Sequence, residues 1–154
     1  MSRRSKKGGL ALATLILITG LIVGVLALRW NARKAALAYG LELQSALFDE
    51  QAPVPEGEPR KQRDIFNEPK MAGYERTLRA PWNLVASDYL ERCEELRVGI
   101  VYLYSQLNLP PALRFAHPPR LRYFKIETAD KGDAGVHTAI RTLMEDYLGA
   151  VGSR

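Results

Sequence analysis

The chain has 154 residues, a length that allows one small domain, and a formal net charge of +5. Residues 1–34 hold 7 of the 22 basic residues and none of the 17 acidic ones, so residues 35–154 hold 15 basic against 17 acidic side chains. Because this larger part has no cationic surplus, we expect no nucleic-acid partner. The single cysteine excludes an internal disulfide, and the two histidines match no standard ligand spacing, so we expect neither a metal nor a cofactor.

Residues 10–28 form an apolar run without a charge, preceded by a basic tail at residues 1–9. At 1.5 Å per residue this run is about 28 Å long as a helix, close to the hydrocarbon thickness of a bilayer. A secretory signal peptide has a shorter apolar core of about 7 to 15 residues. Val25 and Ala27 offer a small pair before a cut at Leu28, but the length favours a retained transmembrane helix over a cleaved leader.

The distribution of basic residues predicts the orientation of this helix. Four basic residues lie in the short tail and three lie just beyond the apolar run, so the positive-inside rule favours a cytoplasmic N-terminus. We therefore expect a single-pass protein of the bacterial inner (cytoplasmic) membrane with a periplasmic C-terminal domain. Tryptophan and basic side chains favour the headgroup region, and the residues predicted at the membrane interface are Arg29, Trp30, Arg33 and Lys34.

Gly20 and Gly24 lie within the apolar run at the spacing G-x-x-x-G. Two glycines four residues apart leave a gap on one helix face and allow a second membrane helix to approach closely. We predict that this face packs against a helix of another membrane protein subunit.

The stretch "KKGG" followed by "LALAT" resembles the leader of type IV pilin-like proteins. The resemblance implies cleavage after Gly9 and polymerisation through the apolar helix. Thr14 would then be the fifth residue of the processed chain, where that family usually has Glu, so the resemblance lacks its most diagnostic residue.

No proline follows the apolar run until residue 53, and residues 29–50 are rich in helix-forming Ala, Leu and Glu. We expect the helix to continue as an amphipathic, membrane-proximal segment whose apolar stripe is covered by the chain's own domain or by a neighbouring subunit. Residues 51–80 are predicted to be a proline-rich linker followed by an irregular segment that lies on another surface.

Residues 81–154 are predicted to form a small α+β extracytoplasmic domain in a mostly α protein. Apolar residues step by three or four from Trp82 to Leu107, behind Pro81, which suits the first turn of a helix. Residues 120–128 alternate like a strand, which would pair with residues 98–104, with the linker or with another polypeptide. A last helix is expected between a cap at Asp133 and a stop at Gly149.

The sequence contains no G-x-S-x-G elbow, phosphate loop, H-E-x-x-H or dinucleotide fingerprint, so we do not expect an enzyme. The favoured hypothesis is an accessory or assembly subunit of a larger membrane complex (respiratory, photosynthetic or secretory) whose partners are other subunits and the bilayer. A processed minor pseudopilin and a membrane-tethered periplasmic binding module are the alternatives. The candidates for partner-facing residues are Leu37, Leu41, Phe48, Phe66, Tyr123 and Phe124.

Overall fold

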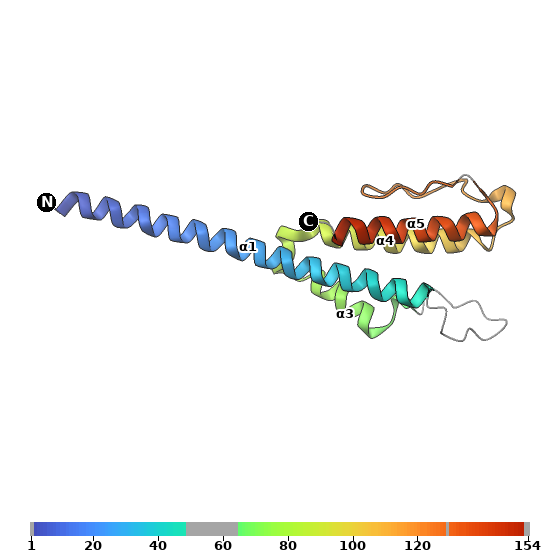
Figure 1. Cartoon of the computed structure of the whole chain (residues 1–154), viewed down its shortest axis with the longest axis horizontal. Coiled ribbons are helices and arrows are strands. Elements are labelled where there is room, and N and C mark those ends of the chain that lie inside the picture. Colours follow the sequence, from blue (N-terminus) through green and yellow to red (C-terminus); the bar gives the residue numbers. More distant parts are fainter. Residues whose placement is uncertain (1, 49–64, 129, 153–154) are drawn as a thin grey trace.

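A computed structural model describes residues 2–48, 65–128 and 130–152, with the side chains of residues 2–5 left out. The elements are α1 (Ser2–Phe48), α3 (Pro69–Leu78), the 3₁₀ helix η1 (Pro81–Ala86), α4 (Ser87–Gln106), the 3₁₀ helix η2 (Pro111–Leu113) and α5 (Asp133–Gly152). Helix α1 projects far beyond the others, which gather around its C-terminal half (Figure 1).

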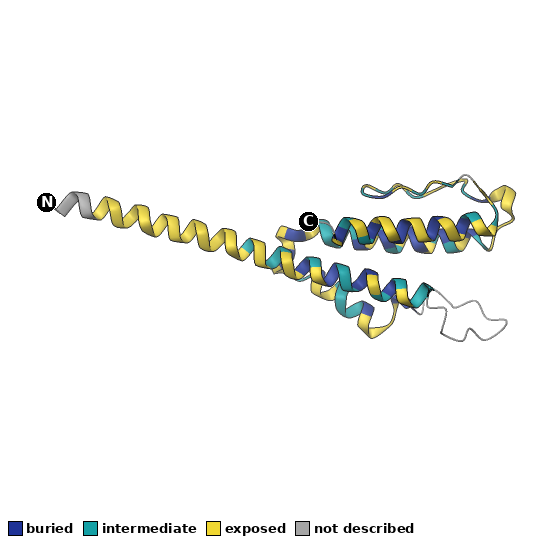
Figure 2. Cartoon of the chain, in the orientation of Figure 1, coloured by how far each residue is buried: buried dark blue, intermediate teal, exposed yellow. Residues whose placement is uncertain are grey.

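Helix α1 is a single uninterrupted helix of 47 residues, about 70 Å long at 1.5 Å per residue. Its N-terminal half is exposed on all sides, and by length and composition it is the one described helix able to cross a membrane. Its C-terminal half contributes fully buried side chains to the domain core. Along this one continuous ribbon, the yellow of exposed residues gives way to stretches of dark blue, which marks buried residues (Figure 2). The fully buried residues of this half are Ala32, Ala36, Tyr39 and Leu43.

The domain core lies where α4 and α5 pack against each other and against α1, with α3 on a further side of α1. The buried positions of α4 and α5 recur every three or four residues, which places them on one stripe of each helix. Those of α4 include Cys93, Leu96, Ile100 and Leu103, and those of α5 include Val136, Ile140, Leu143, Tyr147 and Val151.

Helices α1 and α5 approach each other closely at Gly40. A Cβ atom on Gly40 would lie 2.5 Å from Cε1 of Tyr147 and 2.9 Å from Cδ2 of Leu148, so any residue other than glycine would displace these side chains of α5. One turn earlier, the Tyr147 hydroxyl donates a hydrogen bond to the carbonyl oxygen of Ala36 at 2.6 Å. The absent side chain and the buried tyrosine together set the distance between the two helices.

The predicted α+β domain is wrong, because the described residues 2–48, 65–128 and 130–152 contain helices and no strand; the mostly α expectation agrees with the structure. Residues 120–128 run without regular secondary structure. The Glu95 carboxylate accepts hydrogen bonds from the backbone N–H groups of Arg122 and Tyr123, and the Tyr123 hydroxyl donates to Glu91. The Glu95 carboxylate thus binds two backbone groups that a neighbouring strand would otherwise satisfy.

Three further segments differ from expectation. Part of the segment predicted to be irregular forms α3, which begins at Pro69, and the linker up to residue 64 lies outside the described residues. Pro81 starts a 3₁₀ helix, with the regular α-helix beginning at Ser87. Helix α5 runs past Gly149 to Gly152, since glycine weakens a helix without ending it when tertiary contacts hold the last turn.

We predict that Gly40→Ala lowers the free energy of unfolding by about 1 to 3 kcal/mol, because the added methyl group overlaps the buried Tyr147 ring. Gly149→Ala is the matched control: this glycine is also helical and has no atom within 4 Å of the added methyl, so the substitution should stabilise by about 0.5 to 1 kcal/mol. Chemical denaturation in mild detergent, followed by near-ultraviolet circular dichroism, measures both. Equal effects of the two substitutions would contradict the close approach.

Candidate functional site

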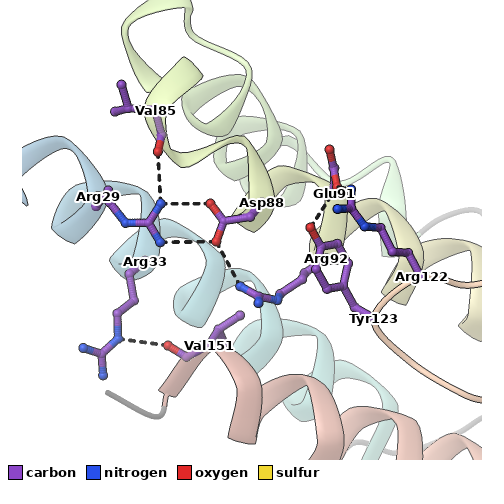
Figure 3. A network of polar contacts seen from close by, with 9 residues as sticks. All are labelled: Arg29, Arg33, Val85, Asp88, Glu91, Arg92, Arg122, Tyr123 and Val151. Atoms are coloured by element: carbon purple, nitrogen blue, oxygen red, sulfur yellow. Dashed lines mark hydrogen bonds and ion pairs between the residues drawn. The ribbon is translucent and has the colours of Figure 1, made fainter. Parts of the chain in front are cut away.

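The exposed and buried halves of α1 meet at a network of charged side chains, which we call the junction (Figure 3). Arg29 is the first residue after the apolar run. Its guanidinium donates to the Val85 carbonyl oxygen at 3.0 Å and to both carboxylate oxygens of Asp88 at 3.0 and 3.3 Å. Arg92, one turn along α4, donates to the same carboxylate at 3.1 Å. Two cations therefore share one half-buried anion, which fastens the start of α4 to α1.

The balance of forces on Asp88 favours its charged form. Burial alone would raise the pKa of this carboxyl, but the hydrogen bonds and positive charge of Arg29, with a contribution from Arg92, hold the pKa below its ordinary value. Asp88 is therefore ionised at neutral pH, and the contact depends on its charge.

Arg33 lies one turn beyond Arg29 and reaches the end of α5. Its Nε donates to the carbonyl oxygen of Val151 at 2.9 Å, and its terminal nitrogen donates to that of Gly152 at 2.7 Å. The last carbonyls of a helix have no partner within the helix and carry partial negative charge. Since α5 has no basic residue in its own last turn, the cation that caps it comes from α1.

Trp30 and Lys34 lie next to the junction along α1 and are exposed. The Trp30 residue is 54% exposed. The Lys34 ammonium and the Arg33 guanidinium make cation–π contacts with its ring, at 5.4 Å and 5.6 Å from the ring centroid. The four residues predicted at the membrane interface thus come together at one level of α1. Two of them hold the domain and two face outward, a division that the sequence did not predict.

Gly20 and Gly24 are exposed on the protruding half of α1, and a Cβ atom on either would meet nothing within 4 Å. The partner-facing candidates are divided. Leu41 is half exposed, Leu37, Phe48 and Tyr123 are partly buried against the core, and Phe66 and Phe124 are buried within it.

Cys93 lies inside the core and contacts the Tyr147 hydroxyl at 3.4 Å. Burial raises the pKa of this thiol to about 12, so it is a neutral packing group rather than a nucleophile. His117 and His137 are both exposed. Within the described ranges, no group of three His, Cys, Asp or Glu side chains is placed to hold a metal ion.

Arg114 is the main structural residue that sequence reasoning missed. It is 4% exposed, donates to the carbonyl oxygens of Leu109 and Lys131 at 3.0 and 2.9 Å, and pairs with Asp133 at 2.7 Å. A buried arginine satisfied by backbone carbonyls orders the long connection between α4 and α5. Its partners lie at both ends of that connection, and two of them are backbone carbonyl groups, which no side-chain pattern in the sequence identifies.

A cavity of about 660 Å³ opens on the outer face of α4. Its lining includes the exposed side chains of Val98 and Val101, the buried Phe66, and Tyr102 and His117. Its lining is largely apolar, which suits contact with another apolar surface more than acid–base chemistry.

Comparison of the chain with protein families, with curated proteins and with solved structures finds no match in any of the three.

We predict that Asp88→Asn lowers the free energy of unfolding at neutral pH by about 1 kcal/mol, the order for a partly exposed ion pair. Because the pKa of Asp88 is lowered by folding, its stabilisation is present above its unfolded pKa and is lost as the pH falls through the folded value. The difference between wild type and variant should therefore vanish in acid. Denaturation in mild detergent at several pH values measures it.

Glu94→Gln is the control for this experiment. It removes an ion pair to Arg79 in which both side chains are about half exposed, and it should change the stability by less than about 0.5 kcal/mol. A deficit of Asp88→Asn that is no larger than that of the control, or one that persists unchanged in acid, would show that the junction does not depend on this charge.

Proposed function

We propose that the protein is a single-pass, membrane-anchored accessory or assembly subunit of a larger membrane protein complex, acting through protein contacts. One observation carries the proposal: a single helix forms both the exposed apolar segment and part of the domain core, without an intervening flexible residue. Such a rod holds the domain at one height and one rotation relative to the apolar segment of the same helix. A fixed pose suits a subunit that must meet its neighbours in register.

The rigid connection also separates this proposal from the tethered binding module. A module that searches for a ligand gains reach from a flexible linker between anchor and domain. Here the domain is fastened to α1 by Arg29 and Arg33 within two turns of the apolar run. The proposed location is the bacterial inner membrane with a periplasmic domain, supported by the basic tail before the apolar run.

Two surfaces are available to the proposed partners. Within the bilayer, the open face at Gly20 and Gly24 allows close approach of another helix. Outside it, Val98 and Val101 expose apolar area beside the cavity on α4.

The proposal is tested by solubilising native membranes in a mild detergent, separating complexes on a native gel and identifying by mass spectrometry what migrates with the chain. We expect one large complex with a fixed ratio of its subunits. Gly20→Leu/Gly24→Leu should weaken this association, and Gly149→Leu, on an exposed position of α5, is the control. Migration of the wild-type chain alone would contradict the subunit proposal.

A processed pilin-like protein is the second candidate, because the apolar half of α1 protrudes with Gly8 and Gly9 exposed. A chain of this kind would be cut after Gly9 and would polymerise through that half. Intact mass of the protein from native membranes distinguishes the two proposals: we expect a chain that begins at Met1 or Ser2. A chain that begins at Leu10 would establish processing, and one that begins at Leu28 would show that the apolar run is a signal sequence.

A further inference from the structure

The helix η1 carries an apolar surface that the domain does not use. Trp82, Leu84 and Val85 are 66%, 79% and 44% exposed. In a 3₁₀ helix, residues three apart share a face, and here Asn83 and Ala86 are the buried pair. Apolar spacing predicts Trp82 and Val85 on the same stripe as the core of α4, but the tighter helix turns both of them outward.

The position of η1 relative to the apolar run is set by direct contacts. The carbonyl oxygen of Val85 accepts a hydrogen bond from Arg29, the first residue after the run. Ala32, three residues later, is already fully buried in the domain. No spacer therefore separates the apolar run from the domain, and η1 lies at the end of the domain nearest the protruding half of α1 (Figure 1).

The headgroup region adds about 5 to 8 Å on each side of the hydrocarbon. If the apolar run crosses the hydrocarbon, its end at Leu28 places Arg29, Trp30 and the adjoining η1 within this layer. An exposed tryptophan flanked by leucine and valine is the chemistry that this layer accepts: the indole favours the interface, and the aliphatic side chains enter the upper acyl region.

We propose that η1 is a second membrane contact, in which Trp82, Leu84 and Val85 insert into the bilayer interface beside Trp30. This inference rests on the proposed membrane anchor. With α1 as the one membrane contact, the domain can tilt relative to the bilayer surface. A second contact at η1 fixes this tilt. The exposed Lys34 beside Trp30 faces the same layer, where anionic headgroups lie.

The test uses the full-length chain in phosphatidylcholine vesicles whose lipids carry bromine, a collisional quencher of indole fluorescence. Trp30→Phe leaves Trp82 as the single tryptophan, and Trp82→Phe leaves Trp30. In Trp30→Phe we expect bromine near the carbonyl end of the acyl chain to reduce emission about twofold or more, as for an interfacial indole, and bromine near the methyl end to have less effect.

The control places a tryptophan at the far end of the domain. Leu113 of η2 is 59% exposed and lies beyond the C-terminus of α4, whose 20 residues span about 30 Å from η1. The triple variant Trp30→Phe/Trp82→Phe/Leu113→Trp should show no quenching by either lipid.

Each other outcome overturns the inference in a recognisable way. Quenching of Trp30 without quenching of Trp82 leaves the anchor intact and removes the η1 contact. Quenching of neither tryptophan removes the membrane anchor itself. If Trp82 is not quenched by lipid but is protected from acrylamide, protein covers it instead. If a tryptophan at position 113 is quenched as strongly as Trp82, the domain lies flat on the bilayer without a specific contact.

Discussion

The close approach of α1 to α5 is the constraint on which the rest of the structure depends. It requires the missing side chain at Gly40 and directs the Tyr147 hydroxyl onto the Ala36 carbonyl. A second close approach, at Gly99 of α4, places the Leu143 side chain of α5 where a Cβ would otherwise lie. Glycines on two different helices therefore let α5 approach both α1 and α4 closely, and the core of the described residues forms from three long helices that all contact one another.

Local patterns predicted the three long helices but not the short helices α3 and η1 or the segments that connect the helices. The apolar run and the stripes of α4 and α5 repeat over several turns, and such long periodic signals are robust. Apolar and polar residues alternate along residues 120–128 because some of the side chains pack on α4 and α5. Phe124, for example, contacts the Tyr147 ring. The same alternation describes a strand. Only the position of Glu95, 27 residues earlier, shows that a side chain replaces the neighbouring strand.

The sequence singled out Arg29 and Arg33 as membrane-interface residues and did not predict that they hold the domain. Tryptophan and basic residues after an apolar run indicate a membrane interface from the sequence alone. The contacts that fasten the domain join Arg29 to Asp88 and Arg33 to Val151, pairs separated by 59 and 118 residues. No local spacing carries that information. Leu37, Phe48 and Phe66 were assigned to partners for the same reason, since an apolar stripe does not reveal whether the covering surface belongs to its own chain.

The unbroken course of α1 also relates directions inside and outside the membrane. At about 100° per residue, Gly20 and Gly24 point about 130°, or roughly a third of a turn, away from the buried stripe of Ala36 and Leu43. Leu41, half exposed, lies on the side opposite that stripe. A helix docked on the glycines would therefore emerge along the flank of the domain, between its packed face and Leu41. The side of α1 on which a neighbouring helix docks within the bilayer therefore determines which side of the domain that neighbour can contact.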